Sequence, residues 1–207
     1  MTSAQDPVRL QVALDPRWIE LPVHEPVEAG EWAAAAVADA LAVRGIVEDP
    51  RVVNLYVQTY AATLDGLRER TTAVDGVLLA GAYALVGQAE LLADTVAELA
   101  YVSMEGFDRF EDVVDSCVAP EVQRFADPDV SELDTAFGTA VRVQQLRIVD
   151  EGEGREPSLQ TSVVYLWPGL APGRAVMLSA WFGSPVDAET TRPVVDQLAA
   201  SLREEPA

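Results

Sequence analysis

Residues 139–183 decide the fold class; they read TAVRVQQLRIVDEGEGREPSLQTSVVYLWPGLAPGRAVMLSAWFG. Three segments, at 139–149, 159–167 and 175–183, are rich in β-branched and aromatic residues, which favour strands. The connections EGEGREP and PGLAPG consist mostly of residues that form turns. Three strands joined by such turns predict consecutive antiparallel hairpins.

In the first of these strands, the apolar residues change from odd-numbered to even-numbered positions part-way along the strand. Val141 and Val143 lie on one side of a regular strand, whereas Leu146 and Ile148 lie on the other. An extra residue between the two pairs would bring them to one face, so we predict a β-bulge near Gln144–Gln145.

Two helices are predicted in the N-terminal half of the chain. One begins near Glu28 and ends at Gly45, because glycine favours the left-handed backbone that follows a helix. The next begins after Asp49, a good N-cap that Pro50 follows in the first turn. Its apolar residues recur at helical intervals: Val53, Val57, Tyr60, Leu64 and Leu67. The short connection predicts an antiparallel helix pair.

The remaining segments complete a single α+β domain over residues 1–207. Residues 120–137 contain two prolines and are predicted to be an irregular connection. The last helix is expected to carry Pro193 in its first turn. The other predicted elements are strands at 8–14, 77–86 and 96–104, the last two of which also fit helices, and helices at 107–118 and 188–203. Strand pairs interrupted by helices indicate a mainly antiparallel sheet flanked by helices.

The composition excludes several classes of partner. The 207 residues include 34 acidic residues against 14 basic ones, all arginine, and the formal net charge is −20. A nucleic-acid or anionic-membrane partner needs a basic surface, so we expect neither. A chain without lysine is typical of a high-GC genome such as that of an actinobacterium. One cysteine excludes an internal disulfide, and no targeting pattern begins the sequence, so we expect a cytoplasmic protein.

The sequence resembles the PsbP-like superfamily, especially small actinobacterial members of unassigned function. An opening strand runs into PRW at 16–18, and the closing part contains TSVVYLW at 161–167, AVMLSAWFGSP at 175–185 and a helix ending LAASLR at 198–203. The resemblance covers about a third of the chain. The resemblance implies an antiparallel sheet sandwiched by helices and a binding or assembly role rather than catalysis. No family active site is implied.

Residue types that carry chemistry are sparse. His24 lies alone in a loop, and Cys117 has an acidic neighbour instead of the basic one that a reactive thiol needs. Weak candidates for a divalent-cation site have helical spacing: Asp108, Glu111, Asp112 and Asp115. The sequence contains no phosphate-binding or nucleophile motif, and we expect no cofactor.

The remaining candidates lie on the predicted strands. Trp167, Met177 and Trp181 are bulky groups that either pack under the chain's own helices or line a surface for a partner or an apolar ligand. Polar groups that would accompany them are Arg142, Gln144 and Glu98. The first hypothesis is a non-enzymatic protein-interaction module, such as an acidic cytoplasmic adaptor or chaperone with a basic partner. The alternative is a small apolar ligand-binding domain, or an enzyme, with a pocket between sheet and helices.

Overall fold

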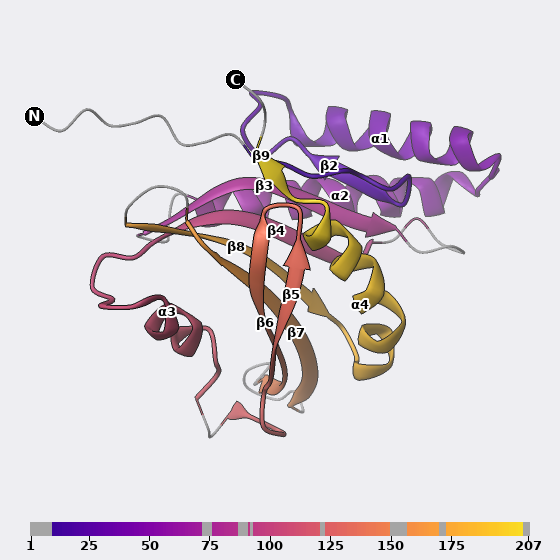
Figure 1. Cartoon of the computed structure of the whole chain (residues 1–207). Coiled ribbons are helices and arrows are strands. Elements are labelled where there is room, and N and C mark those ends of the chain that lie inside the picture. Colours follow the sequence, from indigo (N-terminus) through magenta and orange to yellow (C-terminus); the bar gives the residue numbers. More distant parts are fainter. Residues whose placement is uncertain are drawn as a thin grey trace, which may run out of the picture.

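A computed structural model describes residues 10–71, 76–86, 91, 93–120, 123–149, 157–169 and 173–204. These residues form an α+β fold around an antiparallel sheet of seven strands, as predicted (Figure 1). In spatial order the strands are β2 (Trp18–Leu21), β3 (Val77–Val86), β4 (Ala93–Ser103), β8 (Arg174–Phe182), β7 (Ser158–Pro168), β6 (Gly138–Val149) and β5 (Asp129–Thr135). A separate antiparallel ribbon joins β1 (Leu10–Gln11) to β9 (Arg203–Glu204). The helices are α1 (Ala29–Arg44), α2 (Pro50–Thr71), α3 (Phe110–Ser116) and α4 (Pro185–Ala200).

The consecutive hairpins β6–β7–β8 confirm the prediction made from residues 139–183. The predicted bulge near Gln144–Gln145 is wrong, because β6 and β7 pair in one continuous register. The change of parity has another cause, which is that both faces of β6 pack against apolar groups. Val143 is buried beneath α3, and Leu146 is partly buried on the opposite face. The turns at 150–156 and 170–172 lie outside the described residues.

A bulge does occur in β3, where Leu79 pairs with Ala100 and Gly81 pairs with Leu99. Gly81 leaves room there, because a Cβ atom at this position would lie 2.7 Å from the Tyr83 hydroxyl oxygen. The glycine therefore lets the Tyr83 ring lie along its own strand.

Helices α1 and α2 form the predicted antiparallel pair and cover one face of β2, β3 and β4 (Figure 1). Glu28 caps α1 by accepting a hydrogen bond from the Glu31 amide, and Gly45 ends it with φ of 64°. The face of α2 that contacts the sheet includes Tyr60 and Leu64, from the predicted stripe. No helix in the described ranges is long and apolar enough to cross a membrane.

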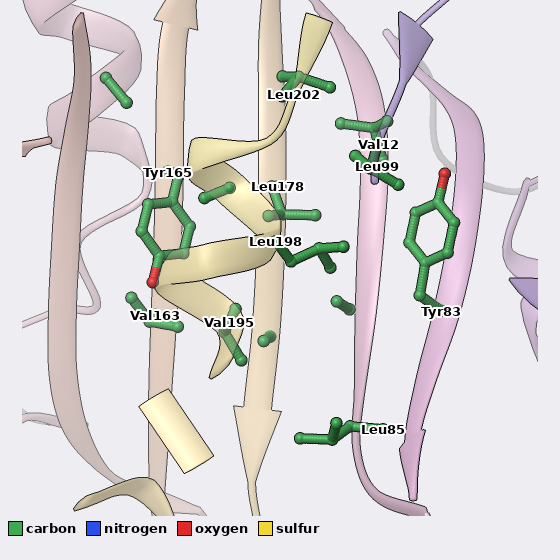
Figure 2. Close-up of a cluster of buried hydrophobic side chains, with 14 of the residues drawn as sticks. Val12, Tyr83, Leu85, Leu99, Val163, Tyr165, Leu178, Val195, Leu198 and Leu202 are labelled. Atoms are coloured by element: carbon green, nitrogen blue, oxygen red, sulfur yellow. The ribbon is translucent and has the colours of Figure 1, made fainter. Parts of the chain in front are cut away.

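Helix α4 covers the opposite face of the sheet. Figure 2 shows Val195 and Leu198 of this helix facing Val163 and Leu178 of the central strands. The helix begins earlier than predicted, because Ser184 caps it by accepting a hydrogen bond from the Asp187 amide. Pro193 consequently lies in the helix interior instead of the first turn.

Several other boundaries differ from the prediction, among them the strand predicted at 96–104, which is β4 at Ala93–Ser103. Residues 120–137 are not irregular throughout, because 129–135 form the edge strand β5. The first strand is only Leu10–Gln11 within the described residues, and residue 8 lies outside them. Helix α3 is shorter than 107–118, and residue 203 belongs to β9 instead of the last helix.

Candidate functional site

The six residues predicted to form a ligand or partner surface lie on both faces of the sheet and do not form one site. Glu98, Met177 and Trp181 occupy the face that α1, α2 and α3 cover. The other three residues lie on the face covered by α4: Trp167, Arg142 and Gln144. Each face therefore requires its own interpretation.

On the α4 face, Arg142 and Gln144 belong to a polar network that joins the helix to the sheet. The Tyr165 hydroxyl donates a 2.6 Å hydrogen bond to Asp196 Oδ1, and Arg142 Nη1 lies 3.4 Å from the same oxygen. Arg192 of α4 donates a 2.9 Å hydrogen bond to the Gln144 side chain. Burial, followed by the hydrogen bond to Asp196, raises the pKa of Tyr165 above its usual range. These hydrogen bonds join α4 to β6 and β7, so they position the helix.

Trp167 lies in the core instead of on a surface. Its side chain is only 1% exposed, and its indole nitrogen donates a 3.0 Å hydrogen bond to the Thr135 hydroxyl. The ring stacks on Tyr165 and meets Phe137 edge-on. A buried indole with a satisfied N–H is a packing group, which accounts for Trp167 without a ligand.

On the other face, Met177 and Trp181 are both partly buried. Met177 contacts both the cluster beneath α1 and α2 and the cluster beneath α3. The Arg147 guanidinium carbon lies 5.4 Å from the centroid of the Trp181 ring, within the range of a cation–π interaction. Arg70 of α2 forms an ion pair with Glu98, with 2.8 Å between Arg70 Nη2 and Glu98 Oε1. This face combines an aromatic group with arginine side chains, a combination typical of binding surfaces.

The sheet edge at β5 is a feature that sequence reasoning missed. Asp129, Glu132 and Asp134 are exposed, and Val130 between them is 52% exposed. Within the described chain, β5 pairs with β6 along one side, and no strand pairs with its outer side. The sequence signal of this strand is weak, because residues 131–134 contain one apolar residue, Leu133, and do not alternate regularly.

The isolated chemical candidates are not arranged for catalysis. His24 is exposed in a turn. Cys117 follows α3, and burial raises the pKa of its thiol, which disfavours the reactive thiolate.

The acidic residues of α3 are arranged as helix-capping and solvent-facing groups. Asp112 accepts a 2.9 Å hydrogen bond from the Arg109 amide, and this bond, with the Arg109 side chain, lowers the pKa of Asp112. Asp108, Glu111 and Asp115 are exposed. Across the described ranges, no three histidine, cysteine, aspartate or glutamate side chains are grouped so that they could hold a metal ion.

Two depressions lie among the described residues, and both are open to solvent. One, of about 220 Å³, is lined by Leu78, Tyr101 and Arg174. The other, of about 270 Å³, lies between α1 and β2 beside Trp18 and Asp39. Sites for drug-sized ligands usually measure roughly 300–1,000 Å³, so both depressions are small for that purpose.

No protein-family model matches the chain, and no curated protein matches its sequence. The PsbP-like resemblance therefore stays a prediction.

Proposed function

We propose that the protein is a non-enzymatic interaction module in which the edge strand β5 pairs with an extended, basic segment of another protein. The observation that carries the proposal is the acidic edge with Asp129, Glu132 and Asp134, whose outer side pairs with no strand of the described residues. An adaptor or chaperone in the cytoplasm is the version we favour. The PsbP-like resemblance, which implies binding and assembly roles, agrees with it.

The backbone of β5 supplies the affinity in this proposal. A terminal strand has amide and carbonyl groups along its outer side, and an extended peptide can satisfy them by adding a strand. β5 spans seven residues, a length typical of strands in stable sheets. Its other side is held by β6 through a regular register from Asp129–Gln144 to Thr135–Gly138. The edge is therefore a fixed template.

The side chains of β5 select the partner by charge. Glu132 and Asp134 face one side of the sheet, and Asp129 faces the other, because each pairs with a residue of that face on β6. Cross-strand pairs of opposite charge contribute roughly 0.2–1 kcal/mol each. A lysine- or arginine-rich strand would form favourable charge pairs on both faces of the sheet. The net charge of −20 would also attract such a strand at long range.

The same charges argue against a second copy of the chain as the occupant. Two copies of β5 would place like charges opposite each other, and this arrangement destabilises a strand pair. Acidic side chains at a sheet edge thus oppose self-association while they favour a basic partner. The proposal commits to a different protein with a basic strand.

The test compares two variants that change the net charge equally. One carries Asp129→Asn, Glu132→Gln and Asp134→Asn in β5. The control carries Asp39→Asn, Asp65→Asn and Glu31→Gln, which are exposed positions on α1 and α2. Proteins that the parent chain captures from the source lysate are identified and purified. The affinity of each is then measured for the parent, the β5 variant and the control variant. The affinity should fall roughly tenfold for the β5 variant and stay near the parent value for the control.

Hydrogen exchange supplies the second measurement. A reconstituted partner that adds a strand should slow the exchange of β5 amides, and added salt should weaken its binding. Equal binding by the β5 variant and the control would overturn the proposal, as would a partner that leaves β5 exchange unchanged.

A further inference from the structure

We infer that Arg124, Arg147, Ser162 and Trp181 form a binding site for the carboxylate of a small, singly charged ligand. The site lies on the sheet face that α3 partly covers. It shares no residue with the acidic edge of β5, so it goes beyond the proposed function and can be tested separately.

The sheet register brings these four residues together. Ser162 of β7 pairs with Trp181 of β8 on one side and with Gln145 of β6 on the other, so the three side chains share one face. Arg147 lies two residues beyond Gln145 on that face, and its guanidinium reaches over the Trp181 ring. An isolated bridge pairs Arg124 with Arg147, which places the two arginines next to each other.

Two buried polar atoms at this site have no hydrogen-bond partner. They are the Ser162 hydroxyl oxygen, in a residue with no exposed surface, and Arg147 Nε. An unsatisfied buried polar group costs about 1–3 kcal/mol, so such groups call for an explanation. Gln145 does not relieve them, because its amide already binds the Ala119 amide and the Cys117 carbonyl. Both atoms are donors that lack an acceptor, and a carboxylate has two oxygens that accept.

The positive charge of the two arginines is also uncompensated. Arg124 donates through Nε to the Ala119 carbonyl, and Arg147 has a long contact of 3.4 Å with Gln123. No carboxylate of the described residues forms an ion pair with either arginine. In a chain with 34 acidic residues, two arginines on paired positions, without an acidic partner among the described residues, favour an anion locally.

The residues around the site indicate which class of anion it would bind. A guanidinium matches a carboxylate through two parallel hydrogen bonds. The net charge of −20 repels a dianion more strongly than a monoanion, so a carboxylate is favoured over a phosphate. Trp181 and its partly buried neighbour Val96 supply an apolar contact for the body of the ligand. Benzoate, which combines a carboxylate with a flat apolar ring, is a suitable probe.

The experiment follows the Nε–Hε signals of the arginines by NMR while sodium benzoate is added. The Arg147 signal, identified by its loss in Arg147→Gln, should shift and saturate. Arg147→Gln should weaken benzoate binding roughly tenfold to a hundredfold, as expected for charged hydrogen bonds. The matched control Arg51→Gln, an exposed position at the start of α2, should bind like the parent.

A second variant keeps the test decisive if Arg147→Gln does not fold. Ser162→Ala retains all charges and should weaken benzoate binding roughly two- to tenfold. Equal binding by the parent and Ser162→Ala, or an Arg147 signal that does not saturate, would overturn the inference. Inorganic phosphate that binds more tightly than benzoate would overturn the assignment to a monoanion. The triple β5 variant should still bind benzoate, so failure of the proposed function would not be mistaken for failure of this site.

Discussion

The hydroxyl of Tyr165, in a central strand, lies 2.6 Å from Oδ1 of Asp196, in the helix that covers that strand. Asp196 also contacts Arg142, so one carboxylate joins α4 to both β6 and β7. Figure 2 shows the Tyr165 ring among apolar side chains, with its oxygen at the edge of the cluster. This contact fixes where α4 lies along the sheet.

Removing this hydroxyl should destabilise the fold. Tyr165→Phe leaves the ring in place but deprives Asp196 of its shortest hydrogen bond. Hydrogen bonds to charged groups contribute about 1.5–3 kcal/mol, so we expect a loss of that size in the free energy of unfolding, measured in urea. Tyr83→Phe is the matched control and should change stability little at neutral pH. Equal effects of the two substitutions would contradict the role given to Asp196.

Alkaline pH should destabilise the protein through Tyr83. Burial, with a smaller contribution from Glu20 across the β2–β3 pair, raises the pKa of Tyr83 from 10.0 to about 12. Between these two values the unfolded chain releases the proton while the folded chain keeps it, so unfolding is favoured as pH rises. The stability is fully present below about pH 10 and is lost as pH rises through about 12.

The measurement is urea unfolding of the parent and Tyr83→Phe across this pH range. The free energy of unfolding of the parent should fall by up to about 1.4 kcal/mol per pH unit more than that of the variant. This slope corresponds to the release of one proton on unfolding. Parallel curves for the two proteins would show that Tyr83 ionises normally in the folded state.

Substituting Pro193 should stabilise the protein. This proline is exposed and lies inside α4, where it has no amide hydrogen for the carbonyl of Glu189 one turn earlier. Pro193→Ala should recover about 3 kcal/mol of helix stability and lose roughly 0.4–1 kcal/mol through a freer unfolded chain. We expect a net gain of about 2 kcal/mol by thermal or urea unfolding. Gln197→Ala, at an exposed position of the same helix, should change little; a Pro193→Ala variant no more stable than the parent would contradict the argument.

The elements with strong local patterns were predictable from sequence. Asp49–Pro50 marks the start of α2 and Gly45 ends α1, because capping and backbone freedom are properties of a few adjacent residues. The bounds of the strand at 77–86 were predicted to the residue, since turn-forming residues bound a continuous apolar run, although that run also fitted a helix. The antiparallel hairpins followed from the same kind of signal.

Tertiary context decided the rest. β5 was missed because Asp129, Glu132 and Asp134 disfavour a strand by themselves, and pairing with β6 supplies what local preference lacks. The placement of Pro193 was wrong because Ser184 begins α4 earlier than the apolar pattern indicated. The grouping of Arg124 with Arg147 and Trp181 depends on strand register, which spacing along the sequence does not reveal.

The strand order has a consequence for how the sheet assembles. β3–β4 and β5–β6–β7–β8 are built from neighbours in sequence, whereas β4 and β8 pair residues 95–103 with 174–182. Closing such a long loop costs more entropy than closing a hairpin. We therefore expect two partly formed half-sheets to precede the complete one during folding, with the β4–β8 junction forming late. Helix α4 packs across that junction through Leu198. The helix would therefore dock at the same time as β4 pairs with β8.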